Sequence, residues 1–178
     1  MKTLLQKIVI TLLVFGLGYS VKAQVPSPAP AHKHGIILTG GTIHTGTGEV
    51  IENSAIAFDK GKITFVGKAE NIGTQFSAFQ KIDVTGKQVY PGLIIMASQL
   101  GLSEIDGVKA TLDVQETGEL NPSVRSAIAF NTESEQIAVA RSNGVLLAQI
   151  IPQGGLISGL SSVMNLDAWN FEDAVYKI

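Results

Sequence analysis

The sequence predicts a mixed β and α/β protein, in which a strand-rich region is followed by strands that alternate with helices. Short apolar segments separated by glycine-containing turns occupy residues 35–90. Two continuous apolar runs, "GLIIMA" at 92–97 and "VLLAQII" at 145–151, flank two helical windows. Because a strand, a helix and a second strand in succession are typical of a parallel sheet, we expect α/β structure after Pro91.

Residues 1–23 have the features of a secretory signal peptide. Lys2 and Lys7 precede an apolar run at 8–18, and small residues lead to a predicted cleavage between Ala23 and Gln24. A membrane anchor is the alternative, but the run is shorter than the roughly 20 residues that cross a bilayer. We therefore expect an exported protein, periplasmic or secreted, with no stable membrane anchor after cleavage.

The composition excludes several classes of function. Cleavage would leave 155 of the 178 residues and remove three of the 13 Lys and Arg residues, so 15 Asp and Glu residues set a net charge of −5. An acidic chain without clustered cations is unsuited to nucleic acid. The absence of cysteine excludes disulfides, thiolate catalysis and cysteine-based metal sites.

Residues 24–34, "QVPSPAPAHKH", are expected to form an extended, solvated linker. Pro26, Pro28 and Pro30 occupy alternate positions and deny the backbone donors and helical freedom. His32 and His34 could bind a metal from one face of a strand. No third ligand lies nearby, so we interpret both as solvated residues.

The region 35–92 is expected to form a small sheet or half of a sandwich. "GIILTGGTIHT" is rich in strand formers and ends at the turn 46–49. "SAIAF" and "ITFVG" are predicted to pair as a hairpin through Lys60 and Gly61, since glycine suits the left-handed position of a short turn. Alternation returns in "KIDVTGKQVY". These strands are too few to bury both faces of a sheet.

The region 93–178 is expected to alternate strands and helices. "GLIIMA" is predicted to be a strand buried on both faces. Helices are predicted over Ser123–Phe130, after Asn121-Pro122, and over Glu133–Ser142, which ends at Asn143-Gly144. "VLLAQII" is a second predicted buried strand, followed by a glycine-rich loop and the beginning of a helix in "LDAWNFEDAVYKI".

These segments resemble a known family. "ILTGGTIHTGTGEVIENSAIAFDKGKITFVGKAENI" followed by "KIDVTGKQVYPGLI" resembles the N-terminal part of the amidohydrolase superfamily, more narrowly its imidazolonepropionase-like branch. "RSNGVLLAQIIPQGGLISGLSSVMNLDAW" is similar to the second-strand region of that branch. The resemblance implies a partial composite β-sandwich over 35–92, followed by the first βα units of a TIM-type (β/α)8 barrel over 93–178.

The resemblance also implies an activity and a cofactor. Such enzymes use a hydroxide bound to a divalent metal such as zinc to hydrolyse amide, lactam or related C–N bonds. In the family, Pro-Gly and two apolar residues are usually followed by Asp-x-His-x-His. Alignment on Pro91-Gly92 places Ile95 at the aspartate, and Ala97 and Gln99 at the histidines. Ile and Ala cannot bind a metal and a glutamine amide is a weak ligand, so the residues present do not support the metal.

Length adds a second departure from the family. A full barrel takes about 250 residues, whereas 88 residues follow Tyr90. We therefore expect a truncated barrel, in a fragment or truncated product that lacks the C-terminal portion of the same fold. A complete small domain is the alternative.

Other candidate sites have ordinary explanations. His44 has no acidic or histidine partner near in sequence, so it is expected to be structural or superficial. The loop Gly154–Gly159 lacks the Lys-Ser or Lys-Thr of a phosphate loop. Neither Ser103 nor Ser161 lies in a complete G-x-S-x-G elbow. The acidic residues between Glu104 and Glu119 match no calcium loop and are expected to be solvated.

Three functions stay open at the level of sequence. The first is an amidohydrolase-like protein, from a family that hydrolyses non-peptide C–N bonds. The segment given by this sequence is not expected to catalyse that reaction alone. The second is a non-catalytic exported relative that binds a small molecule or a partner, and the third is a structural periplasmic domain. Because the C-terminal end of a barrel strand faces the active site, Gln99, Gln153 and Ser158 are predicted to line a small-molecule pocket.

Overall fold

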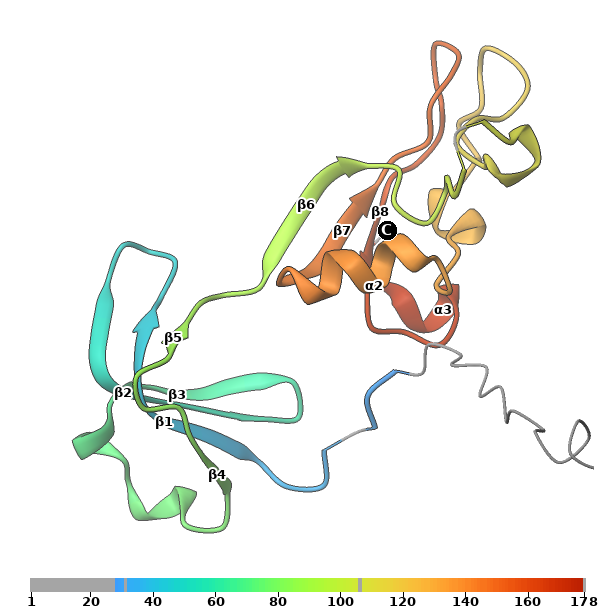
Figure 1. Cartoon of the computed structure of the whole chain (residues 1–178). Helices are drawn as coiled ribbons and strands as arrows, with labels where there is room; N and C mark the ends of the chain where they lie inside the picture. Colours follow the sequence, from blue (N-terminus) through green and yellow to red (C-terminus); the bar gives the residue numbers. More distant parts are fainter. Residues whose placement is uncertain (1–27, 31, 106, 178) are drawn as a thin grey trace, which may run out of the picture.

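The chain folds into two lobes, each built on one sheet (Figure 1). The computed structural model describes residues 28–30, 32–105 and 107–177. We call residues 35–89 the N-lobe and residues 93–177 the C-lobe; residues 90–92 join them. The predicted signal peptide, its cleavage site at Ala23 and Gln24, and part of the proline-rich linker lie outside the described residues. No described helix is long and apolar enough to cross a membrane.

The N-lobe is a five-stranded mixed sheet. Its strands are β1 (Ile36–His44), β2 (Val50–Asp59), β3 (Lys62–Lys68), β4 (Gln80–Asp83) and β5 (Gln88–Val89). β2 pairs antiparallel with β1 and β3, whereas β4 and β5 pair parallel with β1. The predicted hairpin is confirmed: Lys60 and Gly61 form its turn with φ of 49° and 73°, the left-handed geometry that matches the twist of two-residue hairpins.

One face of this sheet is closed by two short 3-10 helices, η1 (Ala69–Asn71) and η2 (Thr74–Phe76). Phe76 packs between Phe65 and Phe79, with ring centroids 5.6 and 5.2 Å away. These rings cover the buried alanines 55 and 57 of β2. Among the described residues no second sheet packs on either face, so this part of the predicted sandwich is a single sheet.

The C-lobe contains one parallel strand–helix–strand unit, as predicted. β6 (Leu93–Ser98) pairs parallel with β7 (Val145–Ile150), and α2 (Glu135–Ser142) lies between them in sequence and packs against β7. Helix α2 ends at Asn143 and Gly144, as expected from the sequence. The remaining strands, β8 (Ser162–Asn165) and β9 (Val175–Lys177), pair antiparallel, so the sheet is mixed rather than fully parallel.

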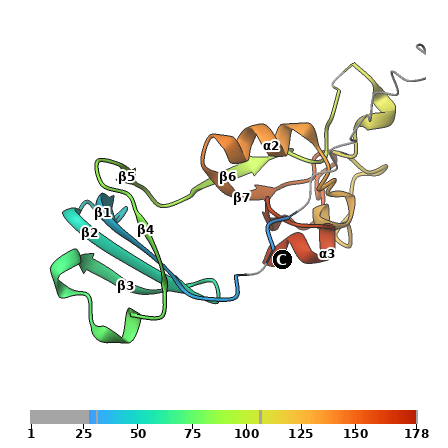
Figure 2. The ribbon, with the colours of Figure 1, turned by 60° about the horizontal axis from the view of Figure 1, so that its bottom comes forward.

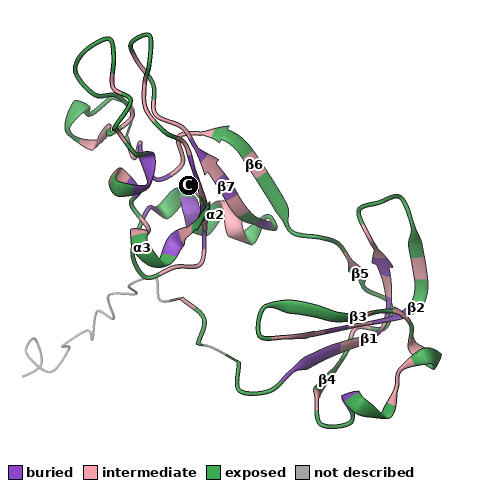
Figure 3. Cartoon of the chain, turned by 180° about the vertical axis from the view of Figure 1, so that it is seen from behind, coloured by how far each residue is buried: buried purple, intermediate pink, exposed green. Residues whose placement is uncertain are grey.

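Three predictions for the C-lobe were wrong in detail. β6 is not buried on both faces, since Leu93, Ile94 and Met96 are 58%, 59% and 76% exposed (Figure 3). It is an edge strand, and β7 is the one described strand that pairs with it. The window 123–130 forms only the 3-10 turn η4 (Ser126–Ala129). The C-terminal helix is limited to α3 (Phe171–Ala174), because the chain leaves it at once to pair as β9.

The C-lobe core lies between its sheet and the segments that cover it. Ala148, Ile150 and Met164 are fully buried, and η4, α2 and α3 each contribute apolar side chains. Two long connections, 99–125 and 151–161, run side by side: Gln153 N donates to Val114 O (2.6 Å) and Leu160 N donates to Val124 O (2.8 Å). Both are therefore ordered by backbone hydrogen bonds. The 3-10 turn η3 (Lys109–Thr111) lies in the first of them.

Candidate functional site

The C-terminal end of β6 is where the family resemblance would place metal ligands. Pairing with β7 shifts register between Ile95 and Ser98, and Ala97 adopts a φ of 54°. This is a β-bulge with a non-glycine residue in the left-handed region, a strained conformation that costs about 1–3 kcal/mol and that clusters at functional sites. The strand is therefore locally distorted at the positions that distinguish this chain from the family pattern.

The side chains at these positions face different surroundings. Ile95 is half-buried and packs against the C-lobe core. Ala97 is exposed. Gln99 is half-buried, and its Nε2 is buried without a hydrogen-bond partner among the described residues. An unpaired buried amide costs on the order of 1–3 kcal/mol, so Gln99 is the polar group least satisfied at this strand end.

These residues do not fit a divalent metal. An aliphatic side chain packed into a core and a methyl group have no lone pair, and a neutral amide is a weak ligand for transition metals. Over the described ranges, no group of three or more His, Cys, Asp or Glu side chains is arranged to hold an ion. The end of β6 therefore does not provide half of a metal site.

The glycine-rich loop 151–161 brings two other predicted residues to the same end of the sheet. Gln153 is exposed, and Ser158 donates from Oγ to Gly154 O at 2.6 Å. A Cβ at Gly155 would lie 2.7 Å from Glu119 O, and its φ is 63°. Close backbone approach thus explains the glycine, while lining of a pocket by Gln99, Gln153 and Ser158 stays a prediction.

The acidic stretch is not uniformly solvated. Glu104 accepts hydrogen bonds from Asn131 Nδ2 (3.0 Å) and Ser134 Oγ (2.8 Å), beside the first turn of α2. Its carboxylate is therefore a structural partner of that helix N-terminus, where negative charge is favourable. Asp113, Glu116 and Glu119 are exposed as expected, and Asp106 lies outside the described residues.

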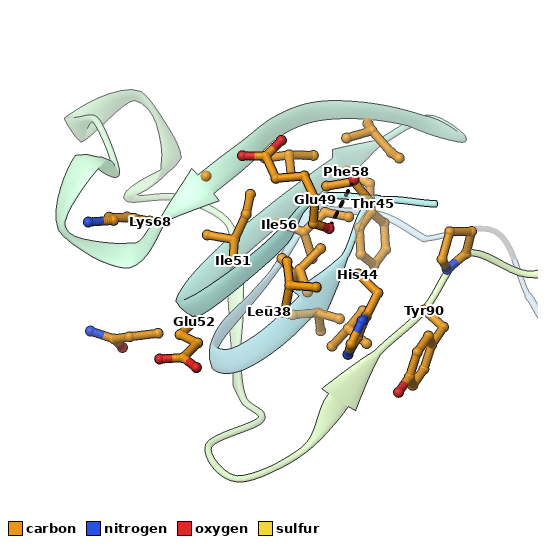
Figure 4. A pocket seen from close by; sticks show the side chains of 18 of the residues that line it. Leu38, His44, Thr45, Glu49, Ile51, Glu52, Ile56, Phe58, Lys68 and Tyr90 are labelled. Atoms are coloured by element: carbon orange, nitrogen blue, oxygen red, sulfur yellow. Dashed lines mark hydrogen bonds between the residues drawn. The ribbon is translucent and has the colours of Figure 1, made fainter. Parts of the chain in front are cut away.

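A hollow lies elsewhere, over the open face of the N-lobe sheet (Figure 4). We call it the groove; its volume is about 1570 Å³. Cross-strand rows of β1, β2 and β3 form its apolar floor, which includes Leu38, Ile56, Phe58, Ile63 and Val66. Glu49, Glu52, Lys68, Glu70 and His44 stand among its lining residues, and Leu146 joins them from the C-lobe.

The groove was not predicted, although the sequence carries a signal for it. "IILTG" and "SAIAF" place small or apolar residues on both faces of their strands instead of alternating with charges. One set covers the phenylalanine cluster and the other is left as the groove floor. His44, expected to be structural or superficial, is half-buried at its edge and stacks on Tyr90.

Comparison with solved structures connects this chain to hydrolases. An amidohydrolase from Thermotoga maritima MSB8 matches with a TM-score of 0.72 at 26% identity, over 80% of this chain and 36% of that one. A molinate hydrolase matches with 25% identity over 64% of this chain and 23% of that chain. A prolidase complexed with N-methylphosphonate-L-proline matches with 25% identity over 64% and 25%.

The TM-scores of the last two, 0.43 and 0.42, are too low to support an assignment. No family model matches the chain, and no curated protein matches it. The chain spans 36% of the length of the Thermotoga maritima protein. The likeness to that amidohydrolase, over most of this chain, supports the amidohydrolase superfamily as its family.

Proposed function

We propose that this chain is part of an amidohydrolase-like protein of the imidazolonepropionase-like branch, whose family activity is hydrolysis of C–N bonds other than peptide bonds. The observation that carries the proposal is the TM-score of 0.72 to an amidohydrolase over 80% of the chain. The N-lobe sheet would then be part of a composite β-sandwich. The parallel unit β6–α2–β7 supports interpretation as the first βα unit of a (β/α)8 barrel.

This segment is not competent for the reaction by itself. The end of β6 presents Ile95, Ala97 and Gln99, which do not fit a metal. Any metal in the whole protein would have to be held by other residues. The signal peptide predicted from the sequence of residues 1–23 supports an exported, periplasmic or secreted location, which is part of the same proposal.

A non-catalytic relative is the second candidate, and a specific observation favours it. Ile95 is half-buried against the C-lobe core, so the strand end is packed as a structural element. Gln99 retains a buried donor without an acceptor among the described residues, and an amide of this kind suits a neutral or anionic oxygen. Such a protein would bind a small molecule or a partner without cleaving it.

Metal content and hydrolysis separate the two candidates. The longest natural polypeptide that contains this chain is purified without its leader, loaded with Zn²⁺ or Mn²⁺, dialysed and submitted to elemental analysis. A panel of amides, lactams and carbamates is assayed in parallel. A hydrolase retains at least one metal per chain and cleaves a member of the panel. A metal-free, inactive protein refutes the hydrolase proposal.

A variant of the same polypeptide provides the matched control. Ile95→Asp, Ala97→His and Gln99→His together restore the family pattern at β6, and histidine tolerates a positive φ better than most side chains. If the parent is metal-free because these ligands are missing, the triple variant should retain more metal than the parent. If the parent and the triple variant retain equal amounts of metal, the missing ligands at β6 are not the reason that the parent is metal-free.

A further inference from the structure

The two lobes meet at a short junction, which we define as residues 88–92: strand β5 at the edge of the N-lobe and the three joining residues 90–92. Strand β5 pairs parallel with β1, with Gln88 opposite Thr42 and Val89 opposite Ile43. Thr42 N also donates to Lys87 O at 3.0 Å. A two-residue strand makes too few hydrogen bonds to hold a chain direction alone. Additional contacts must therefore define the course of the residues that follow.

His44 and Tyr90 provide such a contact. Their rings stack with centroids 4.2 Å apart and an interplanar angle of 10° (Figure 4). His44 Nε2 lies 2.7 Å from Gln88 Oε1, so the imidazole donates to the junction as well. The His44 side chain at the end of β1 thus contacts the junction at two positions, Gln88 and Tyr90. Two contacts fix both the distance of the junction from β1 and its rotation relative to that strand.

The next residues are fitted closely to both lobes. Pro91 lies against Gly46, where an added Cβ would be 3.1 Å from Pro91 Cγ. Gly92 lies against Leu146 of β7, and an added Cβ would collide with that side chain. Leu93 N donates to Gly144 O at 2.8 Å, which begins the C-lobe. Because Pro91 is rigid and Gly92 is packed closely against Leu146, the position of Tyr90 determines where β6 begins.

Little else in the described chain holds the lobes together. Their two buried clusters share no residue. Apart from the junction, the segment before β1 crosses between them (Figure 2), with Ala29 N donating to Asp167 Oδ2 of the C-lobe at 3.3 Å. Tyr90 is 64% exposed, so its ring contributes little by burial. Its stacking contact has an orienting effect instead.

We propose that His44 and Tyr90 form a clasp that sets the orientation of the C-lobe relative to the N-lobe. When the rings are stacked, the junction directs β6 away from the groove in one orientation. When they separate, the junction pivots about β5, and the end of β6 moves relative to the groove. The clasp acts on the geometry between the lobes and does not depend on whether the protein is a hydrolase.

The absence of cysteine from the chain makes a direct distance measurement possible. Lys62→Cys on β3 and Glu172→Cys on α3 introduce two exposed sites outside the junction, and spin labels there report the distance between the lobes. The parent pair should give one narrow distance distribution. His44→Ala and Tyr90→Ala should broaden and shift it, whereas Tyr90→Phe, which keeps the ring, should leave it unchanged.

Hydrogen exchange gives an independent measurement on the same variants. Loss of an aromatic pair corresponds to a roughly 2- to 10-fold change in an opening equilibrium. Amide exchange in the peptide that covers residues 88–93 should therefore accelerate by about that factor in both alanine variants, while α2 and β7 are unaffected.

A matched substitution controls for general effects. Tyr176→Ala removes a 71% exposed tyrosine that stacks on no described ring. Circular dichroism establishes that each variant is folded; if His44→Ala unfolds, Tyr90→Ala decides, since its ring lies outside both cores. The clasp is refuted if a folded Tyr90→Ala variant keeps the parent distance distribution, or if Tyr176→Ala broadens it equally.

Discussion

The N-lobe and the C-lobe differ in how far apart in the sequence their paired strands lie. In the N-lobe, β1, β2 and β3 are consecutive and pair as hairpins, and the sheet has one covered and one open face. In the C-lobe, Leu93 of β6 pairs with Val145 of β7 across a long connection. Its core encloses four side chains with no exposed surface. Local pairing builds three strands of the first lobe, to which β4 and β5 are added by pairing with β1. The second lobe depends on segments that meet only in the tertiary structure.

The largest expected effect tests whether the C-lobe core is as closely packed as its burial implies. Met164→Ala removes a side chain with no exposed surface and should lower the free energy of unfolding by about 2–5 kcal/mol, because a cavity is left. Met96→Ala on β6 is the matched control, since that methionine is 76% exposed. Denaturant titration measures both. Equal effects would show that β6 is buried in solution.

A second substitution tests the turn that follows the candidate site. Gly101 has a φ of 76°, and an added Cβ would lie 2.7 Å from the buried ring of Phe130. Gly101→Ala should cost about 1–3 kcal/mol through backbone strain and overpacking. Gly107→Ala, where a Cβ meets nothing within 4 Å, should change little. If Gly101→Ala leaves the free energy of unfolding unchanged, this turn does not pack against Phe130 as the structure shows.

Two serines, one in each lobe, provide a sharper comparison. Ser54 and Ser162 are each 1% exposed. Ser54 donates to Gly41 O at 2.6 Å, whereas Ser162 Oγ has no partner among the described residues. Ser54→Ala should cost about 1–2 kcal/mol, and Ser162→Ala should be neutral or stabilising, because a lone buried hydroxyl is unfavourable. Thermal unfolding of both variants tests the expected difference in sign.

A smaller, stabilising effect is expected at the bulge of β6. Ala97→Gly relieves a left-handed conformation that costs roughly 1–2 kcal/mol, less the entropy cost of glycine, for a net gain of about 0.5–1 kcal/mol. Ala138→Gly in helix α2 should instead lose about 1 kcal/mol. Opposite shifts in Tm support the strained bulge. A destabilised Ala97→Gly variant would mean that the strand is regular there.

The smallest effect concerns acid sensitivity in the N-lobe. Hydrogen bonds to Asp83 from the Thr85 hydroxyl and then the Thr85 amide lower its pKa in the folded chain. Because the pKa of Asp83 is lower in the folded chain, its ionised carboxylate stabilises the fold at pH values above the unfolded pKa of about 4. This stabilisation is lost as the pH falls through the folded pKa. Asp83→Asn should therefore lower Tm near neutral pH, with a difference from the parent that shrinks below about pH 4.

Asp113→Asn, on an exposed C-lobe loop, controls for the loss of one carboxylate. Melting curves of parent and both variants between neutral and acidic pH provide the measurement. A difference between parent and Asp83→Asn that stays constant with pH would exclude the hydrogen bonds to Thr85 as its cause.

Sequence reasoning was most successful where structure is local. The hairpin turn at Lys60 and Gly61 was predictable because its residues alone favour the required φ values. The stop of α2 at Gly144 was predictable for the same reason. Residues 123–130 had a helical pattern but form a 3-10 turn, because Ser126 donates to Ile150 O (2.9 Å) and its neighbours pair with the loop 151–161. Tertiary contacts there override propensity.

Some features of the candidate site could likewise be predicted from the sequence, whereas others depend on tertiary contacts. That Ile95, Ala97 and Gln99 cannot together hold a metal follows from their chemistry, which the sequence states directly. The bulge at Ala97 and the unpaired Gln99 amide could not be predicted, because they depend on the register between β6 and β7. The groove and the ring stack of His44 on Tyr90 likewise require knowledge of which faces meet.

By itself the sequence determined the hairpin that turns at Lys60 and Gly61, the parallel strand–helix–strand unit and the resemblance to amidohydrolases. These depend on residue spacing and turn chemistry, which act over a few positions. Only the tertiary structure decided that β6 is an exposed edge strand and that residues 88–92 are held by His44. Both depend on contacts between residues far apart in sequence, and spacing along the chain carries no information about them.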